Sequence, residues 1–366
     1  MNHRTRVLLA VGLTVVLFLG VQLGALALIE PFHDSDRQAV EDPDDPANSV
    51  VYFAIILVAT ALMLVTFKYD VQWLIKAMII GVSVMLAWFV FAELVPPAVT
   101  VGGVNAVAAL AAVGIGAALL FYPEWYVIDS TGVVMGAGAA ALFGISFGLL
   151  PAILLLSVLA VYDAISVYGT EHMLDLAEGV MDLKIPVVLV IPTTLSYSYL
   201  AAGSTDGVLE DESGDETDSA SAEATPTDST STTAANGGPS TSDTDATGDD
   251  ARTDADAEID GTDPDEGGME RDALFIGLGD AVIPTILVAS AAYFLDVGTI
   301  DVPGIALNVP ALGALVGTIA GLLVLMFMVL KGRPHAGLPL LNGGAIGGYL
   351  LGALASGLSL MTALGL

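Results

Sequence analysis

Two aspartates stand inside long apolar runs of this 366-residue chain, and they are the residues best suited to do chemistry. Asp163 lies in the apolar run 151–169, and Asp280 lies in the run 272–295. An ionised carboxylate at the centre of a bilayer costs at least ~2.5–3.5 kcal/mol on insertion scales, so an acid at that depth indicates a functional site. The residues next to the two acids are Tyr162 before the first and, before the second, Gly277, Leu278 and Gly279.

Two carboxylates a few ångströms apart cannot both ionise cheaply, so they share a proton and titrate as a coupled pair. The ionised member can take a proton from a water molecule, which then attacks a peptide carbonyl. The protonated member binds the oxyanion and later protonates the leaving amine. Neither a metal nor a covalent intermediate is needed. The pair therefore predicts an aspartic endopeptidase that uses no metal and no cofactor.

The elements that must position these acids are membrane helices. The chain is 55% hydrophobic and only 14% charged, which is more apolar surface than one soluble core can bury. Runs of about 17–25 apolar residues are long enough to cross ~30 Å of hydrocarbon. They predict an all-α polytopic membrane protein with nine transmembrane helices, at 7–29, 50–67, 72–95, 99–121, 132–149, 151–169, 272–295, 309–330 and 338–360.

The predicted organisation has four parts. Residues 1–169 form a six-span membrane part, and 271–366 form a three-span membrane part. Residues 170–203 between them begin with an amphipathic pattern, which predicts an interfacial helix followed by a strand-like connector. The segment 204–270 is rich in Asp, Glu, Ser and Thr, and its low hydrophobicity and one-sign charge predict a disordered acidic loop.

The formal net charge of −31 comes largely from that acidic loop. An excess of exposed acid with few lysines resembles the proteins of salt-loving archaea, although an ordinary acidic linker would have the same composition. No nucleic-acid partner is expected. The chain has no cysteine, which excludes disulfides and thiol catalysis. Its four histidines lack the spacing of a metal site.

Positive charge predicts the orientation. Of the ten lysines and arginines, only Arg37 falls in a segment that nine spans would place outside. The positive-inside rule therefore predicts a multi-pass protein of the cell membrane, with the amino terminus and the acidic loop in the cytoplasm and the carboxy terminus extracellular. Asp163 then lies roughly 9 Å, and Asp280 roughly 13 Å, from the cytoplasmic ends of their spans. Neighbouring helices ~8–10 Å apart would bring them together.

These motifs resemble a known family. Tyr162-Asp163 and Gly277-Leu278-Gly279-Asp280 are similar to the YD and GxGD signatures of the presenilin and signal-peptide-peptidase intramembrane aspartyl proteases. The resemblance implies that Asp163 and Asp280 are catalytic and that their motif neighbours support the site. A third signature of the family is Pro-Ala-Leu before the last span. Here it reads Pro339, Leu340 and Leu341, with leucine where the family has alanine.

The resemblance also implies the partners. Substrates would be single-span membrane proteins or remnant signal peptides within the lipid bilayer. Presenilins work with partner subunits, whereas signal peptide peptidases and archaeal relatives resemble self-sufficient enzymes, and no obligatory subunit is evident in this chain.

The β-branched run 185–192 has two interpretations. It is either an irregular connector or an edge strand that pairs with an unwound substrate, because a helical peptide must be extended before water can attack its carbonyls. The candidate substrate strand is Val187, Val188, Leu189 and Val190.

Two other functions use the same acids. A proton-coupled transporter or channel would relay protons through them, but it would need further polar residues towards the outer face, and the two runs supply almost none. A prepilin-type GxGD peptidase is the nearest rival enzyme. Nine spans and the Pro339 motif disfavour it.

Overall fold

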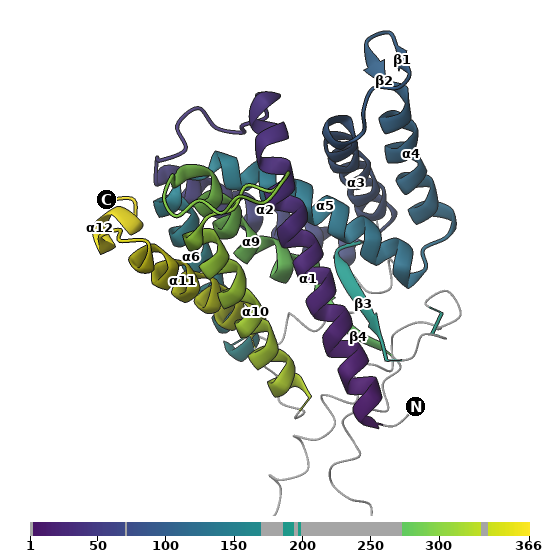
Figure 1. The fold of residues 1–366 in the computed structure, drawn as a ribbon. Coiled ribbons are helices and arrows are strands. Elements are labelled where there is room, and N and C mark those ends of the chain that lie inside the picture. Colours follow the sequence, from purple (N-terminus) through teal and green to yellow (C-terminus); the bar gives the residue numbers. More distant parts are fainter. Residues whose placement is uncertain (1–2, 70–71, 170–185, 194–196, 199–272, 331–335) are drawn as a thin grey trace, which may run out of the picture.

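The computed structural model describes residues 3–69, 72–169, 186–193, 197–198, 273–330 and 336–366. The predicted interfacial helix after residue 169 and the acidic loop 204–270 lie outside the described residues. The long helices, shown in Figure 1, are α1 (His3–Asp34), α2 (Ala47–Lys68), α3 (Gln72–Leu94), α4 (Ala106–Phe121), α5 (Trp125–Ser146), α6 (Leu149–Gly169), α9 (Leu278–Phe294), α10 (Val309–Val329) and α11 (Gly337–Ala355). A short helix, α12 (Leu360–Ala363), follows the last of them.

Six helices of the described part are long and apolar enough to cross a membrane: α1, α3, α5, α6, α10 and α11. Helices α4 and α9 are apolar but shorter, and α2 is apolar over Ala47–Met63. The protein is therefore a mostly helical membrane protein with several apolar helices.

Helix α5 is the most buried of the six candidate spans. It packs against α1, α3 and α9, while α10 and α11 form a close pair that contacts α9 (Figure 1). The amino terminus lies at the end of the bundle that carries strands β3 and β4, and the carboxy terminus lies towards the opposite end (Figure 1).

A two-stranded antiparallel sheet joins the two halves of the chain. Strand β3 (Val188–Pro192) pairs with β4 (Ala273–Gly277), with Val188 opposite Gly277 and Pro192 opposite Ala273. The amide of Leu278 also donates to the carbonyl of Val187 at 2.7 Å. Because antiparallel residues turn alternately toward and away from the partner strand, the backbone groups of Val190 face away from β4.

Sheet β3–β4 corrects the predicted span 272–295. Residues 273–277 are a strand, and the helix begins only at Leu278. A short apolar run fits a buried strand as well as a helix. Here the run forms a strand because it pairs with β3. Asp280 therefore stands in the first turn of α9 and not two turns inside a helix.

A hairpin corrects the predicted span 99–121. Strands β1 (Thr100–Val101) and β2 (Val104–Asn105) are joined by Gly102 and Gly103, both with positive φ, and the helix starts at Ala106. A Gly-Gly pair suits a two-residue hairpin because glycine adopts positive φ without steric cost.

The predicted boundary between the fifth and sixth spans also moves. Helix α5 begins at Trp125, seven residues before the predicted 132, and it includes Asp129 as a buried side chain. The break lies at Phe147-Gly148, so Pro151 stands in the first turn of α6. Proline is tolerated there because first-turn amides have no partner within the helix.

Candidate active site

Asp163 lies on α6 and touches the amino terminus of α11. Its Oδ2 accepts a hydrogen bond from the backbone N–H of Leu338 at 3.1 Å. Leu338 is the second residue of α11, where backbone amides have no acceptor within the helix, and the helix has no side-chain cap at Ala336. Asp163 thus caps α11 from a different helix.

Asp280 lies at the amino terminus of α9, where the helix dipole favours negative charge. Four residues later, Pro284 has no N–H to donate to the carbonyl of Asp280, so that carbonyl lacks its usual helical partner. Gly277 is exposed. A methyl group added to it would meet only Asp280 within 4 Å among the described residues. Within the described part of the chain, no other side chain covers this approach to Asp280.

Two consecutive residues of α11 bring the acids together. Leu338 bonds Asp163, and a Cβ placed on Gly337 would lie 3.3 Å from Oδ2 of Asp280. The carboxylates are close enough for the charge of Asp163 to act on Asp280. Both side chains are partly buried. Two neighbouring carboxylates can share a proton and titrate as a coupled pair.

The other predicted motif residues lie around this pair. The Tyr162 ring packs edge-on against Phe53 of α2, with ring centroids 5.9 Å apart. Pro339 and Leu340 are half-buried in the first turn of α11, and Leu341 is fully buried. The residues of α11 next to the two acids are Gly337 and Leu338, which directly precede the third motif. Leu340 stands where the family has alanine.

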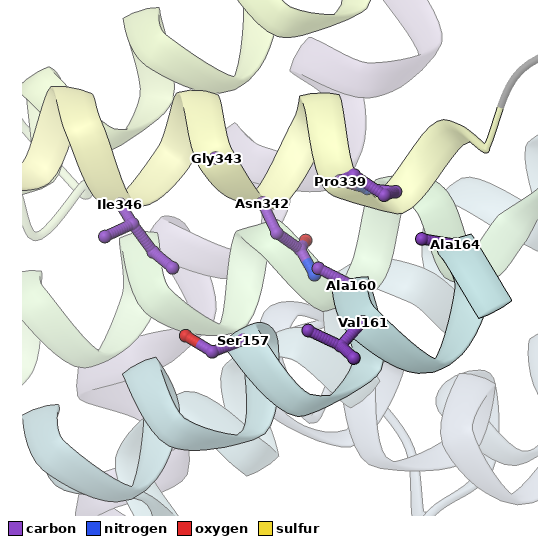
Figure 2. Close-up of a pocket in the computed structure, with 8 residues that line it drawn as sticks. All are labelled: Ser157, Ala160, Val161, Ala164, Pro339, Asn342, Gly343 and Ile346. Carbon is purple, nitrogen blue, oxygen red and sulfur yellow. The ribbon is translucent and has the colours of Figure 1, made fainter.

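An open groove of about 310 Å³ lies between α6 and α11, and its lining includes Ala164, the residue after Asp163 in the chain. Figure 2 shows the two helices facing each other across it, with Ala164 and Pro339 near one end and Ser157 and Ile346 near the other. Asn342 is buried in the groove wall, where its Nδ2 donates to the Leu156 carbonyl at 2.9 Å. The remaining lining residues are Ala160, Val161 and Gly343.

The candidate substrate strand is largely buried in the sheet. Leu189 and Val190 are almost wholly buried, while Val187 and Val188 are partly buried. The outer edge of β3 is occupied at Val190, whose N–H donates to Oδ1 of Asp129 at 2.8 Å.

Asp129 is the polar residue of this region that the sequence did not single out. The predicted span began at 132, which left Asp129 in a loop. No local sequence signal marks its role, because its partner Val190 lies 61 positions away in the chain. Among the described residues, no three histidine, aspartate or glutamate side chains converge as metal ligands would.

Comparison with known proteins identifies the family. Residues 15–358 match the family model described as signal-peptide peptidase, presenilin aspartyl protease. No curated protein matches the chain in sequence.

Two solved structures of a presenilin family intramembrane aspartate protease resemble the fold. In space group C222 the TM-score is 0.57 at 28% identity, over 94% of this chain and 99% of the other. In space group P2 the TM-score is 0.54 at 28% identity, over 93% and 96%. Because the family match spans nearly the whole chain, the protein belongs to the signal peptide peptidase and presenilin family and is an intramembrane aspartic protease.

Proposed function

We propose that the protein is an endopeptidase that hydrolyses peptide bonds within transmembrane segments or remnant signal peptides, with Asp163 and Asp280 as its acid and base. The observation that carries the proposal is that the start of α11 lies next to both carboxylates: the N–H of Leu338 bonds Asp163, and a Cβ added to Gly337 would lie 3.3 Å from Oδ2 of Asp280. One structural element thereby holds the two acids at a single place, where a water molecule and a peptide carbonyl can meet.

The proposed reaction passes one proton around the pair. The ionised carboxylate takes a proton from water, and the new water oxygen–carbon bond forms at the peptide carbonyl. The protonated carboxyl donates a hydrogen bond to the oxygen that becomes negative. When the C–N bond breaks, a proton passes to the leaving amine, and the pair returns to its singly protonated state. No bond to the enzyme forms.

The substrate would have to be extended at the scissile bond, since a helical peptide buries its carbonyls in hydrogen bonds. The sheet β3–β4 ends at Gly277, three residues before Asp280. We infer that the extended substrate passes over Gly277, where there is no side chain to exclude it, and that β3 supports the sheet from behind. The groove between α6 and α11, whose lining includes Ala164 next to Asp163 in the chain, offers the rest of the substrate helix an apolar surface.

The proposed orientation places the amino terminus and the segment 204–270 in the cytoplasm and the carboxy terminus outside. The distribution of basic residues supports it, as does the position of the amino terminus and the sheet at one end of the bundle (Figure 1). The site would then open near the cytoplasmic face. The acidic composition suits a halophilic, archaeal setting, and the enzyme is proposed to work without an obligatory subunit. The transporter interpretation is not favoured by the family match.

The test is cleavage of a tagged single-span peptide by purified protein in detergent at molar salt. Asp163→Asn and Asp280→Asn keep the side-chain shape but remove the shared proton chemistry, so each should lower kcat by about a hundred- to ten-thousandfold. Asp296→Asn, which removes an exposed acid just after α9, is the matched control and should cleave like the wild type. Persistent cleavage by either dyad variant would refute the assignment. Wild-type protein that leaves the peptide intact but carries protons across vesicles would favour a transporter.

A further inference from the structure

Asp129 is a buried acid that the proposed chemistry does not use. Only 3% of its surface is exposed. Its Oδ1 accepts the N–H of Val190, while its Oδ2 is buried without a hydrogen-bond partner among the described residues. A carboxyl group removed from water with half of its hydrogen-bonding capacity unmet is costly. The hydrogen bond that Asp129 does make is to the backbone of β3, which indicates that holding this strand is its role.

The contact leads directly to the predicted dyad. Val190 stands opposite Phe275 in the sheet. Strand β4 then runs without a break into α9, so that the register of β3 against β4 sets where Gly277 and Asp280 lie along the sheet. A strand that slips by one residue turns every side chain to the other face. A contact that holds β3 in place therefore also holds β4 and the start of α9, which carries Asp280.

Helix α5 holds this unit at a second point. Cβ atoms placed on Gly132 and Gly136 would lie 3.7 Å and 3.3 Å from Cδ1 of Leu278, and the same position on Gly132 would lie 3.1 Å from Cδ2 of Leu189. The missing side chains leave room for these two leucines. One face of α5 thus receives both the strand, through Asp129, and the first residue of α9, through the two glycines.

Two other hydrogen bonds hold the chain just after β3, but they involve side chains and not the backbone of the strand. Glu124 accepts the hydroxyl of Ser198 at 2.7 Å, and Arg6 donates to the hydroxyl of Thr193 at 3.5 Å. Both are partly buried side-chain contacts beyond the end of β3. The bond from Val190 to Asp129 is buried and involves the strand's own main chain, so it constrains the register directly.

We propose that Asp129 is a positioning residue that fixes the register of the β3–β4 sheet and thereby selects which peptide bond of the substrate reaches Asp163 and Asp280. The proposal rests on the proposed function, because it assumes that the extended substrate lies over the sheet end at Gly277. Asp129 touches neither the substrate nor the reacting atoms. Its effect is carried by Val190, β4 and the start of α9.

The experiment compares Asp129→Ala, Asp129→Asn and Asp129→Glu with Ser130→Ala. Ser130 is the exposed neighbour of Asp129 on α5, and among the described residues its hydroxyl bonds only the Val127 carbonyl. Products of a single-span peptide are identified by mass spectrometry at each bond, kcat and KM are measured separately, and amide exchange is followed in the peptide that contains Val190. Asparagine keeps an acceptor oxygen at Oδ1. Glutamate keeps the acid but displaces it by one methylene.

We expect Asp129→Ala and Asp129→Glu to spread cleavage over neighbouring bonds and to lower kcat/KM about ten- to hundredfold. Asp129→Asn and Ser130→Ala should keep the wild-type bond. Exchange at Val190 should accelerate in the alanine variant and stay slow in the asparagine variant. A lower rate with unchanged product identity in both the alanine and glutamate variants would overturn the proposal. If the alanine variant does not fold, the products of the glutamate variant test the proposal alone: cleavage at neighbouring bonds supports it, and cleavage only at the wild-type bond overturns it.

The amide-exchange measurement does not require cleavage. If the wild type cleaves no peptide, the proposed function fails. The contact between Asp129 and Val190 is still tested by exchange. If Asp163→Asn and Asp280→Asn abolish cleavage while the Asp129 variants change nothing, only the positioning role fails.

Discussion

Gly337 is a residue of α11 that lies next to Asp280. A Cβ there would lie 3.3 Å from the carboxylate oxygen and 3.4 Å from Cδ2 of Leu325, which is tighter than ordinary contact. Gly337→Ala should therefore displace the carboxylate or fill the space that the attacking water needs. We expect kcat/KM to fall about tenfold or more, with the protein still folded, as measured by peptide cleavage and thermal unfolding in detergent.

Gly347→Ala is the matched control for this substitution. Gly347 lies on the same helix, and a Cβ there would meet nothing within 4 Å among the described residues. It should retain wild-type activity. Equal activity of Gly337→Ala and the wild type would mean that the space beside Asp280 is not used in the reaction.

The helices α10 and α11 approach each other through glycines. Gly313, Gly317 and Gly321 on α10 face Gly344, Gly348 and the turn around Leu340 on α11, and a Cβ on Gly317 would collide with the carbonyl oxygen of Gly344. Small residues permit such close contact in membranes, where packing drives helix association. The pair is therefore the element that holds Gly337 and Leu338 against the two acids.

Gly317→Ala should push α11 away from α10. We expect a loss of about 1–3 kcal/mol in the free energy of unfolding and a fall in activity, because the amino terminus of α11 moves with the helix. Denaturant titration followed by circular dichroism measures the first effect, and peptide cleavage measures the second. A Gly317→Ala variant as stable as Gly347→Ala would show that the two helices are free to separate.

At the scale of the whole molecule, the orientation can be tested with single thiols because the chain has no cysteine. Ser231→Cys lies in the acidic loop, and Leu366→Cys lies at the exposed carboxy terminus. A membrane-impermeant maleimide should label Leu366→Cys in right-side-out vesicles and Ser231→Cys in inverted ones. The cysteine-free wild type is the blank. Labelling of both positions from the same side would mean that they lie on the same side of the membrane, which would contradict the proposed orientation.

Much of the site was accessible without a structure because acids are rare in apolar runs. Burying a charge in a membrane is costly, so Asp163 and Asp280 stand out as functional candidates. Together with the neighbouring glycines and Pro339, they match the motifs of a known family. The family that these residues indicated is confirmed by a match over 15–358. Their catalytic roles, and the passage of the extended substrate over Gly277 at the end of the β3–β4 sheet, stay predictions.

Strand β4 and the role of Asp129 could not be predicted from local sequence patterns. The run Ala273–Gly277 is apolar whether it forms a strand or the first turn of a helix, and its partner β3 lies about eighty residues earlier in the chain. Asp129 looks like a loop residue until Val190, sixty-one positions away, donates to it. Neither contact has a local signature.

Composition and hydropathy by themselves determined that this chain is a membrane protein with two acids inside its apolar runs, because the cost of exposing or burying each residue type depends only on its own chemistry and its near neighbours. Only the tertiary structure decided that Asp163 caps α11, that Asp280 begins α9, and that α5 holds the strand leading to it. These facts depend on hydrogen bonds between segments far apart in sequence, and such bonds form only where the packed helices bring donor and acceptor together.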